Sequence, residues 1–434
     1  MPEPPRLLQR PARSTRRRFL AGATALLGAA GGWPALALTR PQVVVVGGGA
    51  GGAAVVRQLV ALGRDALDIT LVEAERTYTT CYYSNLHLAG YRSLESLQFG
   101  FEGLAALPRV RVVHEQATAV EREARQVRLA DGTKLPYECL VLAPGIALDY
   151  DSVPGWSEAA AQQMPHAWQA GSQTALLERQ LRAVPDGGLI VVIAPPDPYR
   201  CPPGPYERVS MMAHALKSSG RNQAHIVIID PKQSFSKQPL FQQGWEKYYP
   251  GMIEWMPPTI HAGLLGVEPA TLTVETGFET YRHAALVNVV PRQTAARIAI
   301  DTGLSAADGY CPIDPYTMKS RADPAIFILG DAAQAGDMPK SAFAAHDQSR
   351  VVADTIAHDL LGIAAAEARY HNRCWSLVAT DDSVVVGGRY EPTSDNIRQV
   401  DSDLSALDDA PERRRTNAAA AAAWYRNLTT ALYR

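Results

Sequence analysis

The sequence has few residues of the kinds that bind metals or attach haem. It contains five Cys and ten His among 434 residues, and these form no Cys-x-x-Cys, Cys-x-x-Cys-His, His-x-His or His-Glu-x-x-His spacing. Thioredoxin-type cysteine pairs, covalently attached haem and zinc sites commonly use those spacings. Their absence excludes attached haem and a thioredoxin-type pair, and it leaves a metal site without support.

Excess charge and long apolar runs are also missing. Lys and Arg number 42 and Asp and Glu 44, which gives a formal net charge of −2, and 47% of the residues are apolar. This composition excludes an intrinsically disordered chain and, at about 100 to 200 residues per domain, predicts two to four domains. Beyond the N-terminal region no segment reaches the roughly 18 consecutive apolar residues that cross a membrane, so we expect no integral span.

Residues 1–37 predict a twin-arginine export signal. Arg-Arg-Arg-Phe-Leu at 16–20 precedes an Ala/Gly/Leu stretch, and Ala-Leu-Ala at 35–37 suits a signal peptidase. The alternative is an uncleaved N-terminal membrane anchor. Cleavage would remove six Arg and one Glu and leave 36 basic and 43 acidic residues, a net charge of −7. We therefore expect a periplasmic protein, and its negative charge argues against nucleic acid as a partner.

A dinucleotide-binding fingerprint follows the signal. Residues 41–46 are a run of mostly β-branched residues, typical of a strand buried on both faces. A glycine-rich turn at 47–52, a helix-like segment at 53–62 and a second strand at 68–73 come next. This order of strand, glycine turn, helix and strand is the context that the fingerprint requires.

Four residues of the fingerprint have distinct expected roles. Gly47 permits the tight turn, Gly49 lets the backbone approach a pyrophosphate, and Gly52 lets the helix pack closely on the strand. The N-terminus of the helix offers N–H donors and partial positive charge. Glu73, which ends the second strand, would accept hydrogen bonds from the ribose hydroxyls of the cofactor. A glycine turn without a ligand is the alternative.

A later strand supplies further candidate cofactor residues. Residues 325–332 end in Gly-Asp-Ala, and in flavoproteins with two dinucleotide domains such an Asp reaches the ribityl and pyrophosphate oxygens of FAD. Asp331 is therefore a candidate FAD ligand, with a helix cap as the alternative. We expect a helix over 340–359 whose N-terminus faces the flavin pyrimidine edge, where Lys340 would favour the negative charge of reduced flavin.

A second unit resembles the first but lacks its glycines. Buried strands are predicted over 187–193 and 223–230, with a helix over 208–219. The turn at 194–205 is rich in proline, and proline has a fixed φ and no N–H to offer a phosphate. The sequence predicts a second nucleotide fold without a nicotinamide site.

These units predict an α/β protein with two Rossmann-like nucleotide-binding domains of the glutathione-reductase type. The FAD-binding domain would comprise 38–155 and 286–360, and the second domain 156–285. A small α+β interface domain would occupy 361–434, where we expect a strand at 383–388 and a helix near 418–423. Its surface would pack on the flavin region or on another protein, or it would serve as a dimerisation segment.

The five cysteines divide by their positions. Cys139 and Cys311 lie in apolar surroundings and are most simply small buried hydrophobes. Cys201 lies in the proline-rich turn, where we expect it to face the flavin ring, and Cys81 lies within reach of the ring end of the cofactor. Disulfides are permitted in the periplasm, and the odd count leaves at least one cysteine outside them.

Several segments resemble the flavoprotein subunit of flavocytochrome c sulfide dehydrogenase. They are residues 80–85, 199–208, 330–332 with 338–341, and 372–374. The block Cys-Pro-Pro-Gly-Pro-Tyr-Glu-Arg at 201–208 is the most specific of them, and the similarity runs over essentially the whole mature chain. Tyr83 and residues 86–88 depart from the pattern.

The resemblance implies the roles of three cysteines. Cys81 would be joined through sulfur to the 8α-methyl of FAD, and Cys201 and Cys374 would form a redox-active disulfide beside the flavin. Electrons would leave to a separate c-type cytochrome subunit in a heterodimer. Glu207 would move the proton of the reaction, although a first-turn helix carboxylate explains it equally well.

The implied activity is oxidation of sulfide to elemental sulfur or polysulfide. Hydrosulfide attacks one sulfur of the disulfide, and the flavin takes the electrons. The alternatives are a sulfide:quinone oxidoreductase, which would bind the membrane through amphipathic helices, and a non-catalytic FAD-containing subunit. The chain offers only a short segment at 418–428 for membrane binding.

Overall fold

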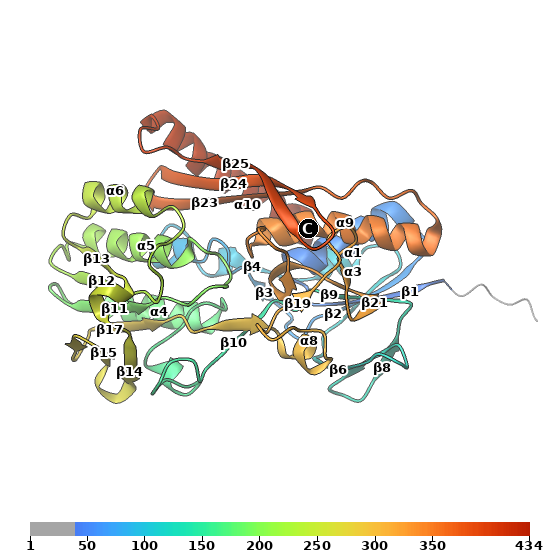
Figure 1. Ribbon diagram of the computed structural model, residues 1–434, viewed down its shortest axis with the longest axis horizontal. Helices are drawn as coiled ribbons and strands as arrows, with labels where there is room; N and C mark the ends of the chain where they lie inside the picture. The colour runs from blue at the N-terminus through green and yellow to red at the C-terminus, as the bar shows by residue number, and fades with distance from the viewer. Residues whose placement is uncertain (1–39) are drawn as a thin grey trace, which may run out of the picture. The chain divides into compact units, whose positions relative to one another are not determined.

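The computed structural model describes residues 40–434 (Figure 1). The predicted export signal, residues 1–37, lies outside the described residues. Within residues 40–434 no helix combines the length and the apolar character that crossing a membrane requires.

The first sheet carries the glycine turn. Its strand order is β20-β21-β9-β1-β2-β5, and all neighbours are parallel except β20 and β21. Helices α1 and α9 pack against each other over this sheet, on the right of Figure 1. The strands and helices are β1 (Gln42–Val46), β2 (Asp68–Val72), β5 (Val110–Val113), β9 (Cys139–Leu142), β20 (Lys319–Ser320), β21 (Asp323–Ile328), α1 (Ala50–Gly63) and α9 (Ala342–Leu361).

The second sheet has four parallel strands in the order β13-β12-β11-β17, on the left of Figure 1. Its elements are β11 (Leu189–Ile193), β12 (His225–Ile229), β13 (Ile253–Met256), β17 (Leu286–Val289), α4 (Ser172–Ala183), α5 (Gly204–Ser218) and α6 (Gln238–Tyr248). Two parallel sheets in an α/β chain confirm the predicted fold class. The predicted boundary between residues 285 and 286 is wrong, because β17 pairs with β11 of this sheet.

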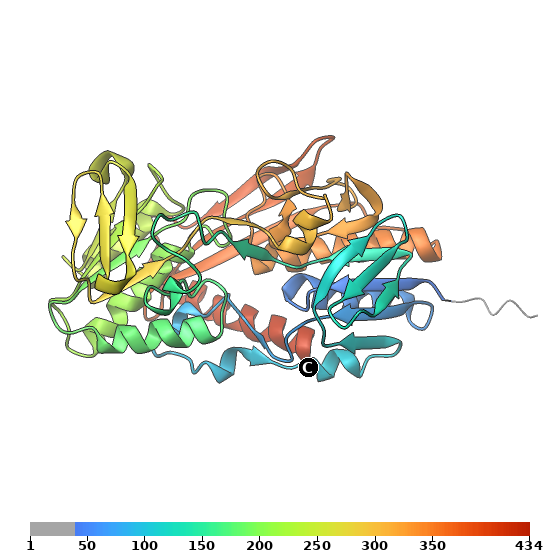
Figure 2. The ribbon, with the colours of Figure 1, turned by 90° about the horizontal axis from the view of Figure 1, so that it is seen from below.

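The C-terminal segment contains more strands and a longer helix than the sequence predicts. Three antiparallel strands, β23 (Tyr370–Ala379), β24 (Asp382–Pro392) and β25 (Ile397–Leu404), precede the long helix α10 (Pro411–Tyr433). Strand β23 contacts α5 and α6 of the second sheet and also α9 of the first. Helix α10 contacts α1 and ends beside the blue and cyan elements of the first sheet (Figure 2). The segment therefore joins the two nucleotide folds.

Shorter elements connect these units. They are β3 (Tyr78–Thr79), β4 (Gln98–Phe99), α2 (Asn85–Leu88), α3 (Glu102–Ala105), β6 (Ala117–Glu121), β7 (Gln126–Leu129), β8 (Lys134–Pro136), β10 (Ile146–Leu148), α7 (Pro258–His261), β14 (Leu264–Glu268), β15 (Thr273–Thr276), β16 (Thr280–Tyr281), β18 (Gln293–Ala295), α8 (Arg297–Asp301), β19 (Cys311–Pro312) and β22 (Ala333–Gln334). Strands β10 and β18 pair where the chain passes between the two sheets.

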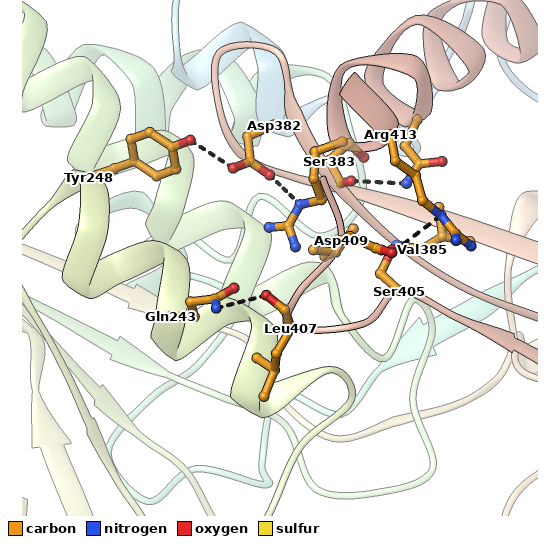
Figure 3. A network of polar contacts seen from close by, with 12 residues as sticks. Gln243, Tyr248, Asp382, Ser383, Val385, Ser405, Leu407, Asp409 and Arg413 are labelled. Atoms are coloured by element: carbon orange, nitrogen blue, oxygen red, sulfur yellow. Dashed lines mark hydrogen bonds and ion pairs between the residues drawn. The ribbon is translucent and has the colours of Figure 1, made fainter. Parts of the chain in front are cut away.

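A network of polar contacts fixes α6 to the C-terminal strands (Figure 3). Tyr248 on α6 donates a 2.7 Å hydrogen bond to Asp382 on β24. The other carboxylate oxygen of Asp382 accepts from Arg414 of α10 at 2.6 Å. Both members of this ion pair are buried. Because a buried carboxylate needs partners, Asp382 holds α6, β24 and α10 in one arrangement.

We expect Asp382→Asn to lower the free energy of unfolding by about 3 to 5 kcal/mol, because it leaves the buried Arg414 guanidinium without a counter-charge. Urea unfolding followed by circular dichroism measures the loss. The matched control is Asp401→Asn, since the ion pair of Asp401 with Arg389 is solvent-exposed, and we expect it to cost less than about 1 kcal/mol. Equal losses in the two variants would contradict the role given to Asp382.

Candidate active site

The glycine turn between β1 and α1 forms a backbone cradle. Gly47 has φ +97°, a conformation that favours glycine, and a Cβ there would overlap the carbonyl oxygen of Ala143. A Cβ on Gly52 would overlap the carbonyl oxygen of Gly47. Glu73 at the end of β2 accepts a 2.7 Å hydrogen bond from the N–H of Gly48. The predicted tight turn and close helix packing are therefore present.

One cavity brings most of the predicted cofactor residues together. Gly47, Gly49, Glu73, Cys81 and Asp331 all line it. Gly52 is not among the lining residues and serves the packing of α1 on the turn. Asp331 thus meets residues that lie 250 or more positions earlier in the chain, at the carboxyl edge of the first sheet, where open α/β sheets bind their ligands.

The surroundings of the Asp331 carboxylate show whether this cavity fits FAD. One of its carboxylate oxygens, Oδ1, is buried and has no hydrogen-bond partner among residues 40–434. Burial raises the pKa of Asp331, and Arg200, whose Nη1 lies 3.7 Å from Oδ2, acts in the opposite direction. A buried, unpaired acceptor is costly unless a ligand satisfies it. A hydroxyl such as those of a ribityl chain would do so, and the cradle at Gly47 suits a pyrophosphate.

Lys340 precedes the first turn of helix α9 and is not part of the helix. Helix α9 begins at Ala342, two residues later than expected, because Ser341 caps it by accepting from the N–H of Ala344 at 3.0 Å. The Lys340 ammonium donates to the carbonyl oxygens of Asp331 and Ala333 at 3.0 and 2.7 Å. It lines a neighbouring cavity and not the glycine cavity. Its effect on a reduced flavin stays a prediction.

Helix α10 packs against the glycine turn and against two residues that line the glycine cavity. The hydroxyl of Tyr433 donates to the carbonyl oxygen of Gly48 at 3.1 Å. Its ring lies 5.6 Å from that of Tyr78, which lines the cavity. Tyr82, another lining residue, lies 5.9 Å from Trp424 of α10. No sequence signal predicts these contacts, because α10 is more than 300 residues from the turn that it contacts.

A second cavity brings the cysteines together. Cys81, Cys201, Cys374 and Glu207 line it, and it shares Cys81 and Arg200 with the glycine cavity. The structure thus places three cysteines from three distant segments around one space. All five cysteines carry free thiols in the structure. The disulfide between Cys201 and Cys374 therefore stays a prediction.

Cys201 is held by its backbone. It has φ +58°, a conformation that is uncommon for a residue with a side chain. Its N–H donates to the carbonyl oxygen of Lys340 at 2.8 Å, and its own carbonyl accepts from Gly204 at 2.7 Å. Helix α5 begins at Gly204, four residues earlier than expected, since proline is tolerated in the first turn. The proline-rich turn thus leads directly into the helix that carries Glu207.

Burial in the cysteine cavity disfavours the ionised forms of acidic groups that line it. Burial raises the pKa of Cys81 and of Cys201. Burial also raises the pKa of Glu207, whose two oxygens accept from Asn85 and from the N–H of Leu377, both at 2.9 Å. A carboxyl with a raised pKa next to thiols is suited to hold or move a proton.

Other lining residues were missed from the sequence. Arg200 lies between the two cavities, and Trp168, Phe343, Trp375 and Trp424 line the cysteine cavity. The indole N–H groups of Trp168 and Trp375 are buried and have no partner among the described residues. Arg200 stands within the segment that carries the family resemblance, but the aromatic residues had no sequence signal, since only tertiary packing brings them to the cavity.

The second sheet has the strand order of a nucleotide fold, but the carboxylate that follows β12 is already paired within the protein. Asp230, directly after β12, is fully buried and accepts from Tyr206 at 2.5 Å and from Trp255 at 2.9 Å. Lys232 lies 2.7 Å from its other oxygen. The carboxylate that would contact the ribose of a nicotinamide dinucleotide is therefore already paired, and this supports the prediction made from the proline-rich turn.

Comparison with known families follows the same division of the chain. Residues 174–291 match "Sulfide dehydrogenase [flavocytochrome c] flavoprotein chain, central" and residues 366–432 match "Flavocytochrome c sulphide dehydrogenase, flavin-binding". Residues 41–184 match the pyridine nucleotide-disulphide oxidoreductases. The chain belongs to the flavoprotein chains of flavocytochrome c sulfide dehydrogenase. This family consists of flavin-dependent oxidoreductases that oxidise sulfide, so the predicted family and enzyme class are confirmed.

Solved structures of similar fold agree with this family. The sulfide:quinone oxidoreductase of the hyperthermophilic bacterium Aquifex aeolicus has a TM-score of 0.70 and 18% identity, covering 90% of this chain and 92% of that one. Putidaredoxin reductase, in its covalent complex with putidaredoxin, has a TM-score of 0.64 and 20% identity, covering 87% and 93%. At such identities these likenesses show the fold, which has two dinucleotide domains.

Proposed function

We propose that the chain oxidises sulfide to elemental sulfur or polysulfide through a redox disulfide of Cys201 and Cys374, with FAD bound covalently to Cys81. Electrons leave to a c-type cytochrome subunit, and the heterodimer works in the periplasm after twin-arginine export. The observation that carries the proposal is the pair of adjoining cavities: three cysteines surround one of them, and Cys81 and Arg200 also line the other.

The residues of the glycine cavity would hold the cofactor. The backbone at Gly47 and Gly49 would bind the pyrophosphate, Glu73 a ribose and Asp331 a hydroxyl of the ribityl chain. Cys81 borders both cavities, which suits an attachment at the edge of the flavin ring. Bound FAD would supply a two-electron acceptor that can be reoxidised one electron at a time.

The cysteine pair would perform the sulfur chemistry. Hydrosulfide attacks one sulfur of the Cys201–Cys374 disulfide, which forms a persulfide on that cysteine and releases the other as a thiolate. When the disulfide forms again, the sulfur atom leaves at the oxidation level of elemental sulfur, together with one proton and two electrons. Glu207 would take the proton; this role is supported by its position in the lining of the same cavity and by burial, which raises its pKa.

Two observations support a cytochrome as the electron acceptor. Both family descriptions that match the central and C-terminal segments name flavocytochrome c. The chain has no Cys-x-x-Cys-His spacing of its own, so the haem would belong to another subunit. A co-purifying c-type cytochrome would support this part of the proposal, and transfer of electrons to a quinone alone would contradict it.

An anaerobic titration tests the proposed donor. We expect sulfide to bleach the flavin absorbance of the oxidised holoprotein, and we expect NADH to leave it unchanged, because Asp230 is already paired and prolines occupy the second turn. Absorbance near the flavin maximum measures both reactions. Rapid bleaching by NADH, or none by sulfide, would overturn the proposal.

A further inference from the structure

Lys237 is a buried lysine beside the cysteine cavity that the proposed reaction does not use. It caps α6 at its N-terminus in a left-handed conformation with φ +63°, and only 6% of the residue is exposed. Its ammonium donates to Ser376 Oγ at 2.8 Å and to the carbonyl oxygens of Cys374 and Val384, both at 3.3 Å. The side chain thus ties α6 to β23 and β24 at the position of Cys374.

The three acceptors of this ammonium are all neutral. No carboxylate lies within ion-pair distance of Lys237 in the part of the chain that the structure describes. Four titratable or charged groups face it: Cys374 on β23, Cys201 before α5, Glu207 on α5 and Arg414 on α10. Burial lowers the pKa of Lys237 to about 8, against the effect of the two cysteines and Glu207. Burying an ammonium among neutral acceptors costs free energy, and an anion that forms nearby would offset that cost.

The proposed sulfur chemistry creates such a need. Attack of hydrosulfide on the disulfide places one negative charge in a cavity where burial already raises the pKa of Cys81 and Cys201. Glu207 adds a second acidic group, and its carboxylate accepts from Leu377 on the same strand as Cys374. A nearby positive charge lowers the free energy of the thiolate or persulfide anion.

We propose that Lys237 positions Cys374 through its backbone and provides the counter-charge for the anion that forms when the cysteine pair opens. The inference rests on the proposed function, since it concerns the same two cysteines. Two hydrogen bonds then attach β23 to the neighbouring helices. Glu207 of α5 accepts from the N–H of Leu377, and Lys237 at the start of α6 donates to the carbonyl oxygen of Cys374. Lys237 acts through Cys374 and is a positioning residue.

The pH dependence of cysteine alkylation tests this role. Reduced holoprotein is treated with iodoacetamide over a range of pH, and modification of Cys201 and Cys374 is followed by peptide mass spectrometry. Lys237→Met should move the midpoint of the more reactive cysteine up by about one pH unit, so that its alkylation near neutral pH slows about tenfold. Lys237→Arg should restore most of the wild-type profile. The control is Lys247→Met, an exposed lysine on the same helix.

The outcomes separate the inference from the proposed function. A uniform change in alkylation rate without a shifted midpoint, or no change, would show that Lys237 is only structural and would overturn the inference. If oxidised wild-type protein forms no Cys201–Cys374 disulfide, the proposed function itself fails. Should Lys237→Met not fold, Lys237→Gln keeps two N–H donors without the charge, and the same shift is expected of it.

Discussion

Cys201→Ser abolishes sulfide-dependent reduction of the cytochrome and leaves FAD bound. Serine cannot form the disulfide that hydrosulfide attacks, so the expected loss of turnover is about 10³-fold or more. FAD remains because Cys201 lines the cysteine cavity and not the glycine cavity. Steady-state assays with sulfide and a c-type cytochrome measure the first effect, and the flavin absorbance of the purified variant measures the second.

The matched control for this variant is Cys139→Ser. Cys139 is buried in β9 and pairs with Val43 of β1 within the first sheet, so the same chemical change occurs away from the two cavities. We expect it to lower stability without abolishing turnover. Turnover of Cys201→Ser close to that of the wild type would rule out the disulfide mechanism.

Cys81→Ser releases the flavin from the chain after denaturation. A serine hydroxyl is a far poorer nucleophile than a thiolate, so the bond to the 8α-methyl would not form. After acid precipitation and filtration, the yellow colour should pass the filter with Cys81→Ser and stay with the protein in the wild type. Cys139→Ser should behave as the wild type does. Flavin that remains on the Cys81→Ser protein would show that the attachment lies at another residue.

The sequence predicted the first nucleotide fold closely because its signals are local. The β-branched run before Gly47 and the strand before Glu73 became β1 and β2, since buried parallel strands need continuous apolar residues. The tight turn at Gly47 follows from a positive φ and a close approach to Ala143 that other residues would not allow. Such constraints act over a few residues and are visible in the chain itself.

The features that the sequence did not reveal depend on distant contacts. Strand β17 is a short apolar run, which looks the same whether it joins the first sheet or the second. Strand β25 is mostly exposed and polar, so it lacked an apolar signal. Lys237 and Arg200 look like ordinary surface residues until the fold brings them beside the cysteines. Cys374 was assigned through the family resemblance alone, and the structure brings it to the cavity of Cys201.

Peptide mapping under nonreducing conditions tests the central claim most directly. Oxidised holoprotein is alkylated, digested and mapped before and after anaerobic addition of sulfide. The account predicts one peptide pair linked through Cys201 and Cys374 before sulfide, and its loss afterwards, with a persulfide or free thiols on these two cysteines. Full alkylation of both cysteines in the oxidised protein, or a linked pair that sulfide leaves intact while the flavin is reduced, would contradict it.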